Sequence, residues 1–197
     1  MKWFPLLNYT HYSLQYGFSK PQELAKKCSQ NSYPACGIAD YKSISGAVSF
    51  YKACIANDIK PIIGCSFDGF SLFAKNKEGW LDLIEIVSTI TADGLEDRKT
   101  MVRLVKRGNL ICISKSEAIS PITGDDHYEW SDSFTQTYYT EKEQAELHRI
   151  LLCSKLKTTL PKVRRNGLPK DQEEWSRFFE SNDFYLKDKS EVSKIVV

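Results

Sequence analysis

The sequence predicts an α/β protein in which strands and helices alternate within one domain. Short apolar, strand-like runs are followed by amphipathic helical segments, which is typical of a mainly parallel sheet, either open or closed into a barrel. The chain has 197 residues, 42% of them hydrophobic, which is enough for one well-packed domain. No internal repeat or low-complexity linker divides it. A single domain over residues 1–197 is therefore expected.

The order of these elements follows from hydrophobic period and from turn residues. The expected strands are residues 4–7, 34–40, 60–67, 71–76 and 109–114, with an extended segment at 135–140. The expected helices are residues 21–31, 46–58, 77–90 and 141–156. The polar, acidic segment 116–133 is expected to be a loop, and the charged segment 158–183 irregular with a short helix at 175–179. Residues 183–197 then read as a strand-like segment followed by the start of a helix.

Two of the helices begin with capping-box patterns. Ser19 is followed three residues later by Gln22, and Pro21 suits the first turn of that helix. Thr140 and Glu143 stand in the same relation before the helix at 141–156. Both patterns support the expected helix starts.

Apolar residues at helical spacing predict which helix faces are buried. In the helix at 46–58 this face consists of Val48, Tyr51 and Ile55. In the helix at 77–90 the expected core positions are Trp80, Leu83, Ile84 and Val87.

Composition excludes several classes of protein. The chain has 27 Lys and Arg residues and 25 Asp and Glu residues. The net charge of +2 is too small to indicate a protein that binds nucleic acid through its overall charge. A nucleic-acid contact would need a local patch, for which the basic run Pro161–Gly167 is the candidate, although such runs are usually solvated surface. No window approaches about 18 apolar residues, and "MKWFPLLNYT" lacks the apolar core of a secretory signal. We therefore expect a cytoplasmic protein without membrane contact.

The six cysteines are expected to be reduced, buried thiols. A zinc cluster normally brings its ligands in close pairs, and the chain has no C-x-x-C pair. They are Cys28, Cys36, Cys54, Cys65, Cys112 and Cys153.

Five segments carry a likeness to a known family. They are "YSLQYGFSKPQELAKKC", "YPACGIADYKSISGAVSFYKACIANDIKPIIGCSF", "LFAKNKEGWLDLIEIVS", "YYTEKEQAELHRILLCSKLKTTL" and "NDFYLKDKSEVSKIV". In this order they resemble the amino-terminal PHP (polymerase and histidinol phosphatase) domain of the bacterial DNA polymerase III alpha subunit. The resemblance covers nearly the whole chain and implies a distorted (βα)7 barrel.

The resemblance also implies where a metal site would lie. Family members hold Zn, Mn or Fe ions with histidines and carboxylates at the carboxyl ends of the strands, and use them for phosphoester hydrolysis. At the matching positions this chain retains only Asp40 as a ligand-type residue. The positions with other residues are Leu7, Tyr9, Tyr41, Ser66, Gln136 and Tyr138.

The lost ligands predict a former metal site without metal, cofactor or catalytic residue. Tyr9, Tyr41 and Tyr138 are expected to fill the vacated end of the barrel with rings and hydroxyls. Asp40 is expected to bond to a hydroxyl or a backbone N–H.

None of the three histidines is expected to replace the lost ligands. His11 is displaced by two residues from the matching motif, and His127 falls in the acidic loop, where exposure is expected. His148 lies on the helix at 141–156, where a half-buried structural role is expected.

Three hypotheses about function follow. The first is a non-catalytic PHP domain that supports the polymerase body of a DNA polymerase III alpha-type replicative polymerase and binds replication proteins such as a proofreading exonuclease. The parent would be a DNA-directed DNA polymerase, a Mg-dependent nucleotidyltransferase that contacts DNA. The chain itself has no D-x-D pair for a two-metal palm. It ends at Val197 within an expected helix, which favours the amino-terminal part of a longer polymerase.

The second hypothesis is an active metal-dependent phosphoesterase or 3′–5′ exonuclease, which the missing ligands oppose. The third is a free-standing viral or mobile-element binding module of PHP type. The segment between Ile90 and Asn109, shorter than is usual in the family, suits such a compact relative. The reading frame beyond Val197 would separate the first hypothesis from the third.

Overall fold

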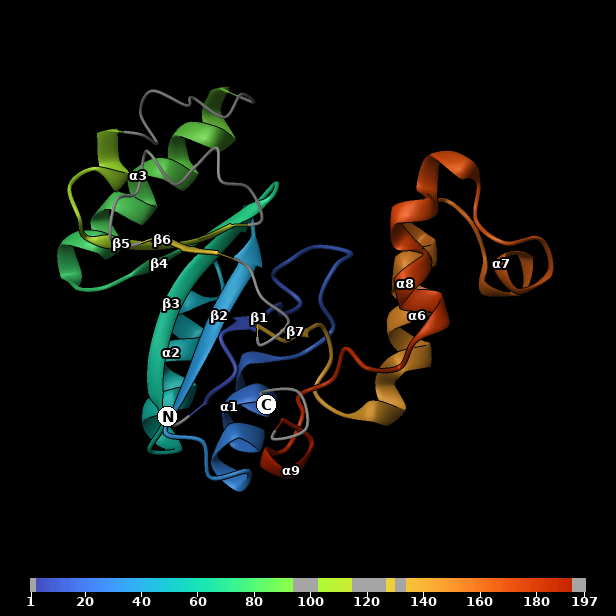
Figure 1. The fold of residues 1–197 in the computed structure, drawn as a ribbon, viewed down its shortest axis with the longest axis horizontal. Helices are drawn as coiled ribbons and strands as arrows, with labels where there is room; N and C mark the ends of the chain where they lie inside the picture. The colour runs from blue at the N-terminus through green and yellow to red at the C-terminus, as the bar shows by residue number, and fades with distance from the viewer. Residues whose placement is uncertain (1–2, 94–102, 115–126, 130–133, 193–197) are drawn as a thin grey trace.

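The computed structural model describes residues 3–93, 103–114, 127–129 and 134–192 as a mixed α/β fold (Figure 1). This confirms the predicted class. The strands are β1 (Leu7–Asn8), β2 (Ala35–Tyr41), β3 (Lys60–Phe67), β4 (Phe70–Ala74), β5 (Leu110–Ser114), β6 (His127–Glu129) and β7 (Gln136–Thr137). The α-helices are α1 (Pro21–Gln30), α2 (Ala47–Ala56), α3 (Lys77–Asp93), α6 (Ala145–Lys155), α7 (Leu160–Asn166), α8 (Ser176–Glu180) and α9 (Lys189–Val192). Two 3-10 segments span Lys142–Gln144 and Lys170–Trp175.

The described strands form two hydrogen-bonded sheets. One has the order β2-β3-β4-β5-β6, in which β2 and β3 are parallel, β4 is antiparallel to both neighbours, and β5 and β6 are parallel. The other is the parallel pair β1-β7. Gly37 of β2 donates its N–H to the carbonyl of Pro5 at 2.8 Å, which ties the start of β1 to the larger sheet. A closed seven-stranded barrel is not confirmed by these pairings.

The tight turn between β3 and β4 is a departure from the expected alternation. Phe67 pairs with Phe70, so only Asp68 and Gly69 lie between the two strands. Gly69 has φ +85°, a conformation that glycine adopts without the cost of a Cβ. No helix therefore separates β3 from β4.

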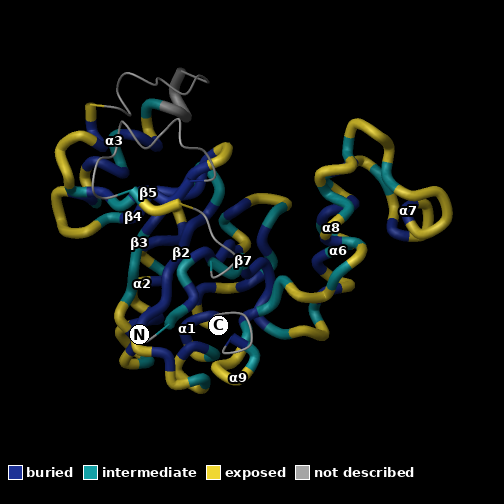
Figure 2. The backbone as a smooth tube through the Cα atoms, viewed as in Figure 1, coloured by how far each residue is buried: buried dark blue, intermediate teal, exposed yellow. Residues whose placement is uncertain are grey.

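Helices α1, α2 and α3 pack on parts of the larger sheet, and buried segments run through the strands (Figure 2). Leu24 of α1 and Phe50 of α2 belong to one core cluster with Ile38 of β2. Leu83 of α3 belongs to a second cluster with Leu72 of β4. The fully buried members of a smaller cluster all come from strands: Leu7, Ala39, Phe73 and Ile113.

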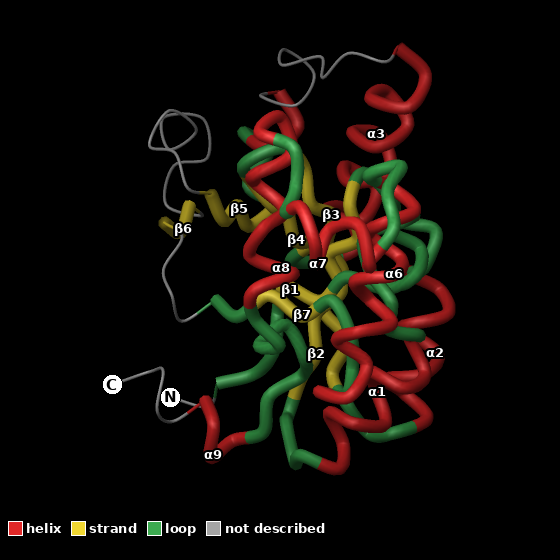
Figure 3. Tube along the Cα trace, turned by 90° about the vertical axis from the view of Figure 1, so that its right-hand side faces the viewer, coloured by secondary structure: helices red, strands yellow, loops and turns green. Residues whose placement is uncertain are grey.

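A helical lobe follows β7. Figure 3 shows α6, α7 and α8 in front of the β1-β7 pair when the right-hand side of Figure 1 faces the viewer. Leu152 of α6 and Phe178 of α8 share a cluster with Tyr9 and Tyr138, which flank that pair. Residues 158–183 are therefore more helical than the sequence predicts.

The predicted apolar face of α2 is wrong. Val48, Tyr51 and Ile55 are 62%, 52% and 57% exposed. The residues of α2 that are buried instead are Ala47, Phe50, Ala53 and Cys54. Both sides of this helix are apolar, so periodicity alone could not identify the side that packs on the sheet.

The first predicted capping box is also wrong. Lys20 is the N-cap of α1, and its side chain makes no capping hydrogen bond. Ser19 is buried and accepts a hydrogen bond from the Thr140 hydroxyl at 3.1 Å. Gln22 donates to Ser49 at 2.9 Å. Tertiary contacts thus use both side chains that the pattern assigned to the helix start.

The second capping box is shifted by one residue from the predicted pair, Thr140 and Glu143. Glu141 is the N-cap of the 3-10 turn before α6, and Gln144 completes the box. The Oε1 atom of Gln144 accepts the N–H groups of Thr140 and Glu141, each at 2.9 Å.

Other expectations can be checked where the chain is described. All six cysteines are buried and free. In α3, Leu83 and Val87 are buried and Ile84 is intermediate, while Trp80 is half-buried. His127–Glu129 is a strand within the segment expected to be a loop. Three parts of these predictions lie outside the described residues: the rest of that loop, residues 94–102 of the segment that is shorter than usual in the family, and the end of the last predicted helix. Among the helices that the structure does describe, none has the length and apolar character to cross a membrane.

Candidate functional site

A pocket of about 340 Å³ lies where β1, β2, β3 and β7 end. Tyr9 follows β1, Tyr41 ends β2, and Ser66 is the second-last residue of β3. Gln136 begins β7 and Tyr138 follows it. Since β1 runs parallel to β7, and β2 to β3, such positions meet at one edge. All five of these residues line the pocket.

Leu7, the sixth position that the resemblance aligns with a family ligand, lies elsewhere. Its side chain is buried in the strand cluster with Ala39, Phe73 and Ile113. A leucine at this position contributes to the core and gives the pocket no polar atom.

Stacked tyrosine rings form one wall of the pocket. The rings of Tyr9 and Tyr138 stack with centroids 4.6 Å apart and 14° between their planes. Tyr41 stacks in the same way on Tyr16, at 5.1 Å and 15°. Tyr16 also lies 5.9 Å from Tyr138, so it joins the two pairs. The sequence prediction named three of these tyrosines and missed Tyr16, although Tyr16 lies within the first quoted segment.

Hydrogen bonds connect the polar groups between the rings. The Tyr9 hydroxyl accepts from Ser66 Oγ and from Gln136 Nε2, both at 3.3 Å. Ser66 Oγ is 2.7 Å from Ser71 Oγ on β4. These groups therefore satisfy one another at the base of the pocket.

A guanidinium group stands beside the phenols. Arg177 of α8 donates to Gln136 Oε1 at 3.0 Å and to the Tyr138 hydroxyl at 3.3 Å. Its guanidinium lies over the ring of Phe178, 4.6 Å from the centroid. No sequence pattern indicated Arg177, because α8 is distant in the chain from the strands that it approaches.

The two carboxylates that line the pocket already have partners. Asp68 accepts a hydrogen bond from the Tyr41 hydroxyl at 2.5 Å and forms an ion pair with Lys42 at 2.7 Å. Glu174 accepts the indole N–H of Trp175 at 2.9 Å.

Asp40 points away from this pocket. Its Oδ1 accepts the backbone N–H of Thr10 and the hydroxyl of Ser13, each at 2.6 Å, and its Oδ2 accepts the Thr10 hydroxyl at 2.8 Å. Successive side chains of a strand alternate between faces, which places Asp40 opposite Tyr41. Burial raises the pKa of Asp40, and the hydrogen bonds from Ser13 and Thr10 oppose that rise. The expectation that hydroxyl and N–H groups bind this carboxylate is confirmed.

The chemistry of the pocket does not fit a metal cluster. Burial raises the pKa values of Tyr9 and Tyr138, and it raises the pKa of Tyr16 to about 12. These phenols are therefore neutral near pH 7, and a neutral phenol is a weak ligand. Within the described ranges of the chain, no group of three or more His, Cys, Asp or Glu residues could hold a metal ion. The positive charge of Arg177 also opposes a cation there.

The histidines do not line the pocket. His11 is exposed, with Nδ1 3.3 Å from the carbonyl of Ser19. His127 is in β6, with Nε2 2.8 Å from the Ser114 hydroxyl. It is half-buried, so the predicted solvent exposure is only partly right. His148 is more deeply buried than expected, and its Nε2–H donates to the carbonyl of Tyr16 at 2.8 Å. Burial lowers the pKa of His148 to about 4.

The basic run lies on α7, away from these residues. Arg164 is paired with Glu146 at 2.6 Å, and both side chains are exposed. A contact of this run with DNA stays a prediction.

Three comparisons place the chain among known proteins. The family model described as PHP domain matches residues 6–187. The DNA polymerase III subunit alpha of Chlamydia pneumoniae is 26% identical over 181 residues, which cover 76% of this chain and 14% of the relative. That of Buchnera aphidicola subsp. Acyrthosiphon pisum is 34% identical over 91 residues, covering 41% of this chain and 8% of the relative. The chain thus spans about a seventh or less of the length of these relatives.

A solved structure also aligns with the chain. It is described as a metal-dependent phosphoesterase from Bifidobacterium adolescentis, with a TM-score of 0.41 and 12% identity. The alignment covers 98% of this chain and 95% of the other.

Proposed function

Because the chain belongs to the PHP domain family, we propose that it is a non-catalytic member that serves as a scaffold in a replicative polymerase of the DNA polymerase III alpha type. One observation carries this proposal. Five positions that the resemblance aligns with family metal ligands line one pocket, and their side chains are three phenols, a hydroxyl and an amide.

The chemistry of phosphoester hydrolysis argues against catalysis in this pocket. The reaction needs an activated water and positive charge at the developing oxyanion, and metals supply both in the family. Arg177 supplies charge, but the neutral phenols cannot serve as a general base near pH 7. What the residues do instead is stack, donate and accept hydrogen bonds, and hold the strand ends against α8.

We also propose that the two sheets are parts of one distorted seven-stranded barrel. Two features support this. The Gly37–Pro5 hydrogen bond ties β2 to the start of β1. Side chains from β1, β2, β4 and β5 share one cluster, as they would in a barrel interior.

The polymerase context is part of the proposal, since the chain spans so small a share of its relatives. In this view a cytoplasmic polymerase body packs against the domain, and the nucleotidyl transfer with its Mg²⁺ and DNA belongs to that body. Replication proteins such as a proofreading exonuclease would be partners of the assembly. A polymerase palm encoded downstream of Val197 would support this context, and a stop codon there would favour a free-standing binding module.

The test is an assay of hydrolysis with a metal analysis. The purified chain is incubated with single-stranded DNA and with a chromogenic phosphoester, in Mn²⁺ and in Zn²⁺, and its metal content is measured after dialysis. We expect no turnover above buffer and less than one metal ion per chain. Turnover that co-elutes with the protein, is lost in Tyr9→Phe and persists in Leu147→Ala would overturn the proposal. Leu147 is the matched control because it is exposed on α6.

A further inference from the structure

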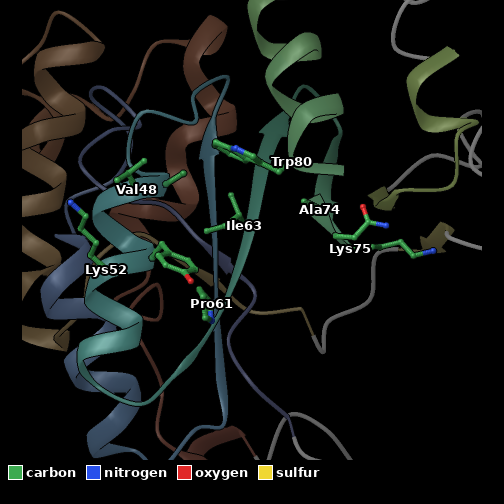
Figure 4. A pocket seen from close by; sticks show the side chains of 10 residues that line it. Val48, Lys52, Pro61, Ile63, Ala74, Lys75 and Trp80 are labelled. Carbon is green, nitrogen blue, oxygen red and sulfur yellow. The ribbon is translucent and has the colours of Figure 1, made fainter. Parts of the chain in front are cut away.

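A second, larger hollow of about 520 Å³ lies on the outside of the sheet, between α2 and α3 (Figure 4). Its apolar walls come from Val48 and Tyr51 on α2, Pro61 and Ile63 on β3, and Trp80 on α3. It shares no residue with the tyrosine-lined pocket. We call it the outer groove.

The topology explains why the outer groove is open. In an alternating α/β fold, a crossover helix between two strands covers the outer face of the sheet. Here Asp68 and Gly69 alone join β3 to β4, so no helix lies between α2 and α3 in the described chain. Pro61 and Ile63 project from the same face of β3, because they are two residues apart. Both are only half-buried.

The α2 side of the outer groove presents an apolar stripe. Val48 and Tyr51 are 62% and 52% exposed, and Ile55, at the next turn of the same helix, is 57% exposed. Their spacing of three and four residues places them on one face. A face of this kind, beside a half-buried tryptophan, is typical of an interaction site.

The α2 edge of the outer groove is basic. Lys52 lies on the α2 side, while the side chain of Lys75 extends away from the groove, as Figure 4 shows. None of the residues that line the groove is acidic. The charge of Lys52 therefore favours a ligand with carboxylates at the α2 edge of an apolar centre.

We propose that the outer groove binds an amphipathic α-helix of a partner protein, one with an apolar face and with Asp or Glu residues at the edge that meets Lys52. Such a helix would lie where a crossover helix between β3 and β4 would otherwise cover the sheet. The ten residues of α2 span roughly 15 Å, which is about three turns of a helix lying alongside it. The inference extends the proposed scaffold role with a binding surface, and it does not depend on the chemistry of the tyrosine-lined pocket.

The experiment uses three capped helical peptides of about 16 residues, a length at which designed helices begin to form in water. They share Leu residues at i, i+4, i+7 and i+11 and differ only in the flanking positions, which are Glu, Gln or Lys. Binding to the full chain is measured by fluorescence anisotropy in low and high salt. Lys52→Glu, Val48→Glu and, as a matched control on another helix, Leu147→Glu are measured in parallel, since all three side chains are exposed.

We expect the Glu-flanked peptide to bind about tenfold or more tightly than the Lys-flanked one, with the difference shrinking at high salt. Val48→Glu should weaken binding about tenfold, Lys52→Glu should reduce the preference for Glu, and Leu147→Glu should change nothing. Equal binding of the three peptides, absence of binding, or no effect of Val48→Glu would overturn the proposal. So would a dimer of the chain that Val48→Glu converts to monomer, because a second copy would then fill the groove. Hydrolysis does not enter these measurements, so this inference can fail while the proposed non-catalytic pocket stands.

Discussion

At the scale of the residue, Asp40 shows how a buried carboxylate can hold two strand ends together. Both of its carboxylate oxygens accept hydrogen bonds, and the backbone N–H of Thr10 is one of the donors. A hydroxyl can turn toward another acceptor, but the N–H of Thr10 cannot. The carboxylate therefore fixes the turn after β1 against the end of β2.

This role predicts different costs for two substitutions of Asp40. Asp40→Ala leaves the buried N–H of Thr10 without its acceptor, and should lower the free energy of unfolding by about 3 kcal/mol. Asp40→Asn keeps an acceptor oxygen and should cost about 1 kcal/mol. Urea denaturation of the three proteins measures both values. Equal, negligible costs would mean that the hydrogen bonds do not stabilise this turn.

His148 gives the fold a dependence on pH. Its pKa is lowered by burial to about 4 in the folded chain, against about 6.5 in an unfolded one. Between these values the unfolded chain binds more protons, so stability is lost as the pH falls from about 6.5 toward 4. Relative to pH 7, the wild-type protein should lose about 2 kcal/mol at pH 5 from this group.

The matched control is His148→Gln, which can still donate to the carbonyl of Tyr16 but does not titrate. Its unfolding free energy should fall less between pH 7 and pH 5 than that of the wild-type protein. The same pH slope in both proteins would show that His148 titrates normally.

At the scale of the element, the sequence predicted where helices and strands occur better than which side of each is buried. The expected strand at 60–67 matches β3, because its apolar run is bounded by clear turn residues. The buried face of α2 could not be predicted, since Phe50 and Tyr51 offer apolar surface on different sides. Tyr51 is exposed beside the outer groove, where the two-residue turn after β3 brings no helix to cover it.

Trp80 and Leu83 of α3 test this distinction between faces. The sequence alone predicts a loss of about 3–5 kcal/mol for Trp80→Ala as a core residue. Since Trp80 is half-buried at the edge of the outer groove, we expect about 2 kcal/mol. Leu83→Ala, at a fully buried position of the same helix, should cost more, about 3 kcal/mol. Denaturant midpoints that rank the two variants in the opposite order would place Trp80 in the core.

At the scale of the whole molecule, the resemblance could predict that the strand ends meet at one edge. It could not predict the residue that the helical lobe places beside them. Tyr9, Tyr41 and Tyr138 follow or end strands, so their meeting at one edge was expected. Arg177 reaches the pocket from α8, through packing between segments about 40 residues apart, and no local pattern encodes that contact. The lobe thus gives the pocket its positive charge.

The whole molecule should therefore be indifferent to metals. A metal bound only by the folded chain, at 100 times its dissociation constant, would add about 2.7 kcal/mol to the unfolding free energy. For a chain of this size, that raises the melting temperature by roughly 5–10 °C. Because the pocket holds neutral phenols beside Arg177, we expect changes below about 1 °C in EDTA, in Zn²⁺ or in Mn²⁺. A saturating rise of several degrees that disappears in Gln136→Ala would mean that these residues do hold a metal, and the scaffold proposal would then lose its chemical basis.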